Sequence, residues 1–62
     1  MIGDNIQARR VSESITQEQL AEAVGVSRQT VAKWESGETT PDFEHAVSVA
    51  KVLNVSLDDL AG

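Results

Sequence analysis

The side chains best suited to recognise another molecule lie on one face of a short segment that begins at Arg28. At helical spacing, Arg28, Gln29 and Lys33 fall on one face of this segment, while Val31 and Trp34 fall on another. A guanidinium, an amide and an ammonium suit the edges of nucleic-acid bases, since arginine can bind guanine and glutamine can bind adenine through two hydrogen bonds each. On an arbitrary helix such a polar face is more often simply solvated. Its functional interpretation therefore depends on the neighbouring elements that position it.

Two helices joined by a very short turn would hold this face. The apolar spacing predicts helices over 17–24 and 28–36, with only residues 25–27 between them. A joint this short forces a sharp angle, and the small Ala21 lets the two helices approach closely, as in a helix-turn-helix. The segment from Ser27 to Ser36 would then be the helix that enters a major groove. In this context, DNA contact becomes the better interpretation of the polar face.

Helix signals continue along the rest of the chain, and no two-residue period lasts long enough for a strand. Thr16, Ser27 and Ser56 each stand where a side chain can cap a helix start, and Gly25 and Gly37 follow helical stretches. We therefore predict one all-α domain over residues 1–62, with five helices at about 3–12, 17–24, 28–36, 42–53 and 57–60. The apolar stripe of the fourth helix consists of Phe43, Ala46, Val47, Ala50 and Leu53.

The formal net charge of −5 argues against a nucleic-acid partner, because affinity for DNA of any sequence rests on Lys and Arg. The acidic excess is unevenly placed. Residues 1–37 hold four Lys and Arg against five Asp and Glu, a net charge of −1, whereas residues 38–62 hold one against five, a net charge of −4. We expect the acidic half to point away from the duplex.

Several classes of site and partner are excluded by the composition. Cysteine is absent, which removes disulfides, thiolate nucleophiles and cysteine zinc sites. His45 has no second histidine with which to bind a metal, and Asp58 and Asp59 are explained as partners of a helix dipole. Trp34 is better explained as a core residue than as a base-stacking one. No catalytic site can be assembled, so we expect no enzyme activity, cofactor, metal or small-molecule ligand, and no membrane partner.

Several motifs together resemble the Cro and phage-repressor family of bacterial regulators, the XRE family. The resemblance runs from about Ile2 to Leu60 and implies a compact, five-helix fold of the lambda-repressor type. Its most specific elements are Thr16-Gln17-Glu18-Gln19-Leu20-Ala21, Gly25-Val26-Ser27-Arg28, Trp34-Glu35-Ser36-Gly37, Pro41 and Leu53-Asn54-Val55-Ser56-Leu57.

The resemblance also implies roles for individual residues. It places Arg28, Gln29 and Lys33 at base-reading positions, and it implies an ion pair between Arg10 and Glu35. Gln17 would bind a phosphate at the start of its helix, where backbone amides also attract anions. The full set of expected phosphate contacts is Thr16, Gln17, Ser27, Thr30, Thr39 and Thr40.

Three positions depart from the family pattern. Arg9 stands where many members have leucine, Ser14 stands where many have glycine, and the loop that begins at Glu38 lacks the usual basic residues. We expect hydroxyls of Thr39 and Thr40 to replace lost lysines, with a modest dependence of binding on salt.

These observations lead to two hypotheses about function. The first is a sequence-specific regulator of transcription, typically a repressor, that binds a pseudo-palindrome of double-stranded DNA as a homodimer. Such a bacterial or phage protein would be cytoplasmic and, when bound, associated with the nucleoid. Dimerisation would use apolar side chains near the C-terminus, namely Val52, Val55, Leu57 and Leu60. The alternative is a protein-interaction module on the same fold, antitoxin-like or coactivator-like, whose working surface is the acidic half.

Overall fold

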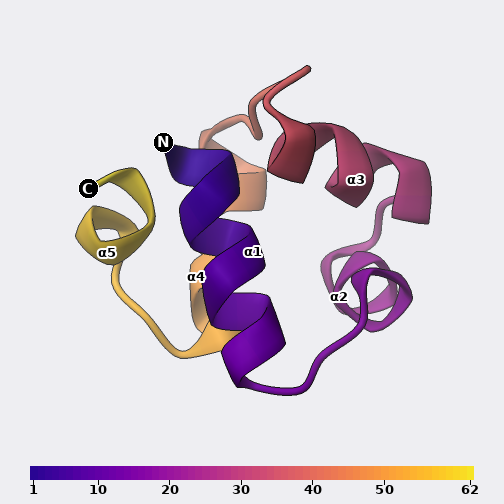
Figure 1. The fold of residues 1–62 in the computed structure, drawn as a ribbon, viewed down its shortest axis with the longest axis horizontal. Coiled ribbons are helices and arrows are strands. Elements are labelled where there is room, and N and C mark those ends of the chain that lie inside the picture. The colour runs from indigo at the N-terminus through magenta and orange to yellow at the C-terminus, as the bar shows by residue number, and fades with distance from the viewer.

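The computed structural model describes residues 1–62 and contains five α-helices and no strand, which confirms the predicted fold class (Figure 1). Each boundary lies within about one residue of its prediction. None of the helices is both long enough and apolar enough to cross a membrane. The helices are α1 (Ile2–Ser12), α2 (Gln17–Val24), α3 (Arg28–Ser36), α4 (Phe43–Leu53) and α5 (Leu57–Ala61).

Local hydrogen bonds explain where the helices begin. The side chains of Thr16, Ser27 and Ser56 each accept a hydrogen bond from the backbone N–H three residues later, as predicted from their spacing. Asp42 does the same for His45 and caps α4, so this helix begins at Phe43 rather than at residue 42. A side-chain acceptor directly before the first turn therefore marks the start of four of the five helices.

Left-handed residues end the helices and turn the chain. Gly25 and Gly37 have φ values of 87° and 84°, a conformation that glycine adopts without a steric penalty. Asn54 ends α4 at φ 58°, and Ser14 turns the chain between α1 and α2 at φ 59°. Ser14, noted above as a departure from the family pattern, thus lies in the conformation that glycine favours.

The core lies between the helices and consists of side chains from all five of them. Ile6, Leu20, Val31, Leu53 and Leu60 are 0–1% exposed, and Trp34 is buried beside them, as predicted. The predicted stripe of α4 is only partly correct. The buried residues of this helix are Ala46, Val49, Ala50 and Leu53, whereas Val47 is half-buried and Phe43 is 73% exposed. The side chains of Val47 and Phe43 lie at the edge of the buried face of α4.

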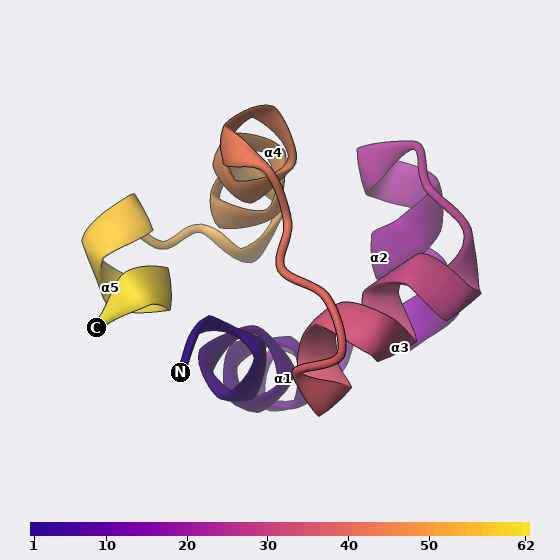
Figure 2. The same ribbon diagram turned by 90° about the horizontal axis from the view of Figure 1, so that it is seen from above.

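The helix α1 runs through the middle of the molecule. In Figure 1, α2 and α3 lie on one side of it and α5 lies on the other, while α4 passes behind; Figure 2 shows the same arrangement from above. Contacts join α1 to α3 and α5, and join α2 to α3 and α4. At the crossing with α3, a side chain at Gly3 would overlap the Trp34 carbonyl oxygen. The absence of a side chain at this position is what allows α1 and α3 to approach.

Candidate nucleic-acid interface

The turn between α2 and α3 is held by backbone hydrogen bonds and by two apolar side chains. The amides of Gly25 and Val26 donate to the Ala21 carbonyl oxygen at 2.8 and 3.0 Å. Ala21 is buried, and Val26 packs half-buried against the core. The three-residue joint predicted from the sequence is therefore a fixed turn, and it orients α3 relative to α2.

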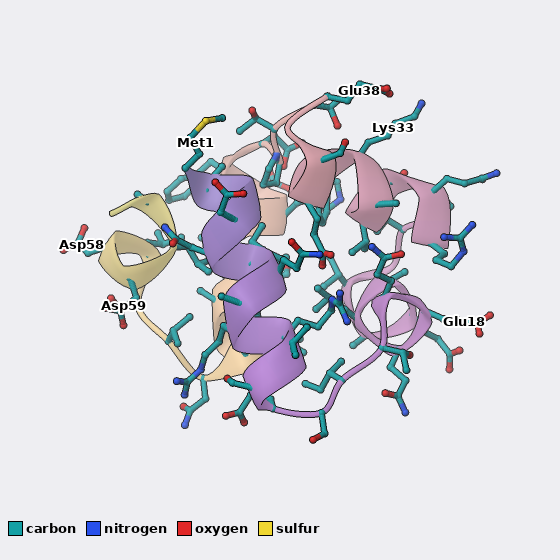
Figure 3. All side chains as sticks on the ribbon, viewed as in Figure 1. Met1, Glu18, Lys33, Glu38, Asp58 and Asp59 are labelled. Carbon is teal, nitrogen blue, oxygen red and sulfur yellow. The ribbon has the colours of Figure 1, made fainter.

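The two faces of α3 have different environments. Val31, Trp34 and Glu35 are buried, at 0%, 3% and 7% exposure. Arg28 and Lys33 are exposed and, like the neighbouring Gln29, extend away from the core. Figure 3 shows the Lys33 side chain reaching outward from α3. The three polar side chains predicted to read bases are thus accessible together on the outer surface of one helix.

A buried ion pair fastens α3 to α1. Arg10 donates through Nε and Nη2 to the Glu35 carboxylate at 2.6 and 3.0 Å, and through Nη1 to the Ile15 carbonyl oxygen at 2.8 Å. The hydrogen bonds and the charge of Glu35 raise the pKa of the Arg10 guanidinium, although burial opposes this shift. The two side chains are only 11% and 3% exposed, so Arg10 has a structural role and is not available to an outside ligand.

Gln17 connects this ion pair to the outer face of α3. Its Nε2 donates to Glu35 Oε1 at 3.0 Å, and its Oε1 accepts a hydrogen bond from Arg28 Nη1 at 3.4 Å. Neither contact was predicted from the sequence. They mean that one N–H of the Gln17 amide is occupied inside the protein and that the amide oxygen lies beside Arg28.

The hydroxyls expected at phosphates occupy two kinds of position. Thr16 and Ser27 serve as caps, and Ser27 Oγ also lies 2.9 Å from Thr30 Oγ1. These three residues therefore surround the first turns of α2 and α3, where backbone N–H groups have no partner within the helix. Thr39 and Thr40 are exposed in the loop between α3 and α4.

Two further charged side chains have partners that sequence reasoning missed. Arg9, noted only as a departure from the family pattern, donates through Nε to the Leu53 carbonyl oxygen at 3.3 Å and lies 3.6 Å from Glu13. Lys33 Nζ lies 3.8 Å from Glu38 Oε2 across the end of α3. Lys33 and Glu38 are five residues apart, a separation that does not bring two side chains together along a regular helix. Their contact depends on Gly37, which turns the chain back.

Histidine and the C-terminal apolar residues have structural environments. The His45 ring lies 5.7 Å from that of Trp34, and its Nδ1 lies 3.1 Å from Asp42 Oδ1. Leu60, expected to help form a dimer, is instead 1% exposed, because α5 folds back onto α1 and α4 and places this side chain in the core. Val52, Val55 and Leu57 are half-buried and keep some exposed apolar surface.

A family model described as helix-turn-helix matches residues 6–60. The chain belongs to this helix-turn-helix family. The family and the fold class predicted from the sequence are thereby confirmed, and a family of regulators agrees with the prediction that the chain is not an enzyme.

Individual relatives are regulators of transcription. The chain is 40% identical over 57 residues to the transcriptional activator BcrR of Enterococcus faecalis, covering 92% of this chain and 28% of BcrR. It is 36% identical over 61 residues to the cryptic phage CTXphi repressor RstR of Vibrio cholerae, covering 98% of this chain and 54% of RstR. The chain therefore spans about a quarter to a half of the length of these curated relatives.

A solved structure of the P22 c2 repressor, in complex with a synthetic operator, is also similar. The TM-score is 0.92 at 38% sequence identity, and the match covers 97% of this chain and 91% of that one. The agreement extends over all five helices and so includes the helix-turn-helix.

Proposed function

We propose that this chain is a sequence-specific domain that binds double-stranded DNA as part of a transcriptional regulator, with α3 in the major groove. The observation that carries the proposal is the two-sided character of α3. Its inner face is held by the core and by the Arg10–Glu35 pair, while Arg28, Gln29 and Lys33 extend outward together. A rigidly held helix with exposed hydrogen-bonding side chains has the properties needed for reading base edges.

The roles follow from the positions on this surface. Arg28 and Gln29, at the front of α3, reach deepest into the groove, and Lys33 contacts bases or the adjoining backbone one turn later. The phosphates are bound by residues around the two helix starts and the following loop. In this proposal the phosphate-binding residues are Thr16, Gln17, Ser27, Thr30, Thr39 and Thr40.

Phosphate binding at the start of α2 depends on the backbone more than on the Gln17 side chain. One N–H of that amide is already donated to Glu35, which leaves one for a phosphate. The partnerless amides of the first turn and the positive end of the helix dipole supply the remaining attraction.

We further propose that two copies bind one pseudo-palindromic operator. A single reading helix of nine residues contacts few base pairs, and a symmetric dimer doubles the contacts at half-sites about one helical turn apart. The apolar surface left on Val52, Val55 and Leu57 is the part of the C-terminal half that a second copy would cover. Sedimentation that gives only monomer, with and without operator, would contradict the dimer.

Repression is the simplest outcome, because a bound dimer covers its site and excludes other proteins from it. The relatives include both an activator and a repressor, so the position of the operator relative to the promoter would set the sign. Acting on bacterial or phage DNA, the protein would work in the cytoplasm and associate with the nucleoid when bound.

The proposal is tested by selecting bound sites from random duplexes and then measuring the affinity of Arg28→Ala for the selected site. Loss of a two-bond contact to guanine should cost about 1–3 kcal/mol of binding free energy. Lys51→Ala is the matched control, since Lys51 is an exposed cation on α4, outside the helix-turn-helix. If the wild-type protein enriches no sequence and retards no duplex at low salt, a protein-interaction module becomes the better account.

A further inference from the structure

Few cations remain for DNA once the internal contacts of this domain are counted. The sequence has five Lys and Arg. Arg9 and Arg10 bind backbone carbonyl oxygens and carboxylates within the chain, and Lys51 lies on α4. Among the five cations, only Arg28 and Lys33 lie on the helix-turn-helix and can approach a phosphate or a base. Whether either of these two side chains is paired with a carboxylate therefore has a large influence on the affinity for DNA.

Glu38 is held beside one of these two cations by the backbone. After the left-handed Gly37, the amides of Glu38 and Thr39 both donate to the Lys33 carbonyl oxygen, at 3.0 and 3.2 Å. The Glu38 amide also lies 3.4 Å from Ser36 Oγ. The chain thus returns over the last turn of α3 and positions the Glu38 side chain over Lys33.

The two charged groups meet at the outer end of α3. The Lys33 Nζ and Glu38 Oε2 atoms are 3.8 Å apart, and the side chains are 56% and 64% exposed. Figure 3 shows Lys33 extending from α3 and Glu38 extending from the loop that follows it, both toward solvent. An exposed pair of this kind adds only about 0–1 kcal/mol to the stability of a fold. The pair matters instead for a negatively charged group, such as a DNA phosphate, that approaches the same surface.

We propose that Glu38 is a specificity-determining residue, which pairs with Lys33 and thereby lowers the affinity of the domain for DNA of arbitrary sequence. The inference rests on the proposed function. A phosphate that approaches Lys33 must displace the Glu38 carboxylate and then lie close to it. Attraction that depends on charge alone is therefore weakened, whereas hydrogen bonds from Arg28 and Gln29 to the correct bases are retained. A larger share of the binding free energy therefore depends on the sequence of the DNA.

The test measures binding by fluorescence anisotropy with two labelled probes, a pool of 25-base-pair random duplexes and the site enriched by selection. The proteins are the wild type, Glu38→Gln, Lys33→Gln, the double variant and Glu13→Gln. Glu13→Gln is the matched control, because Glu13 is also an exposed carboxylate, 3.6 Å from Arg9, but lies at the far end of α1. Thermal unfolding confirms that all five proteins fold.

We expect Glu38→Gln to bind the random pool about three- to tenfold more tightly than the wild type at low salt. The slope of log affinity against log salt should steepen by up to about 0.9, the value for one more neutralised phosphate. The gain at the enriched site should be smaller, so the ratio of specific to random affinity falls. In the Lys33→Gln background, removal of the Glu38 charge should change random binding by less than about twofold.

Two results would overturn the inference while leaving the proposed function intact. Equal gains from Glu38→Gln and Glu13→Gln would mean that only net charge matters. A full gain from Glu38→Gln without Lys33 would mean that Glu38 repels DNA directly and not through the pair. If no variant binds either duplex, the proposed function itself fails, and the inference fails with it.

Discussion

The helices α1 and α3 cross at the centre of the domain, and each carries two cationic side chains that it uses in opposite ways. On α1, Arg9 and Arg10 are turned toward carbonyl oxygens and carboxylates of the same chain. On α3, Arg28 and Lys33 are exposed. The number of Lys and Arg in a sequence therefore does not measure the charge that a DNA-binding surface presents. What matters is whether the partners of each cation are buried with it, as for Arg10 and Glu35, or exposed and open to a competing anion, as for Lys33 and Glu38.

The largest effect expected from this comparison is on folding, through Arg10. Arg10→Met leaves the Glu35 carboxylate buried without its partner, which should cost about 3–5 kcal/mol of unfolding free energy. This is comparable to the whole stability expected for so small a core, roughly 3–5 kcal/mol. Urea denaturation followed by circular dichroism measures the loss. A change below about 1 kcal/mol would contradict the structural role of the pair.

The double variant Arg10→Met with Glu35→Met separates the ion pair from simple packing. With both charges removed, no buried carboxylate is left uncompensated, and most of the lost stability should return. A double variant no more stable than Arg10→Met would show that the volume or shape of these side chains, and not their charge, is what α1 and α3 require.

The next effect concerns the close approach of the same two helices at Gly3. Helix propensity alone predicts that Gly3→Ala stabilises α1 by up to about 1 kcal/mol. The structure predicts the opposite sign, because the new Cβ would overlap the Trp34 carbonyl oxygen, and overpacking of this kind costs about 1–3 kcal/mol. Thermal unfolding of Gly3→Ala decides between them. Ala8→Gly, at an exposed position of α1, calibrates the propensity contribution.

The smallest effect on stability is expected on the α3 side of the comparison. Arg28→Met makes the same substitution as Arg10→Met, but at an exposed side chain whose only hydrogen bond is 3.4 Å long. Its unfolding free energy should stay within about 0.5 kcal/mol of the wild type. Urea denaturation of the two variants side by side tests whether the two cations differ as the structure indicates. A loss of several kcal/mol at Arg28 would remove the distinction between the two helices.

Local signals account for the parts of the fold that could be predicted. A capping side chain bonds to an amide three residues away, and a left-handed glycine ends the helix directly before it, so Thr16, Ser27, Gly25 and Gly37 act within one or two turns. The inward position of Trp34 follows from its spacing relative to Val31. The face that carries Arg28, Gln29 and Lys33 could be predicted for the same reason.

Other positions could not be predicted, because their environment is made by distant parts of the chain. Phe43 continues an apolar stripe but lies outside the core, and Leu60 looks like exposed apolar surface but is buried. The phosphate role expected for Gln17 stays a prediction, but the bridge that its amide forms between Glu35 and Arg28 was not foreseen. In each case the local spacing is correct and the neighbours on other helices set the outcome.

By itself, the amino-acid sequence determined five helices, their boundaries, the helix-turn-helix and the polar face of its second helix, because hydrogen bonds and apolar periods over a few residues specify them. Only the tertiary structure decided which charges are internal and which face solvent. The partners of Arg9 and Gln17 include groups 44 and 18 residues away in the sequence, and the reason for Gly3 is a carbonyl group on another helix. The Arg10–Glu35 pair, 25 residues apart, was expected only from the resemblance to a known family and from no local pattern. Contacts over such separations arise from the packing of whole helices, and no local pattern encodes them.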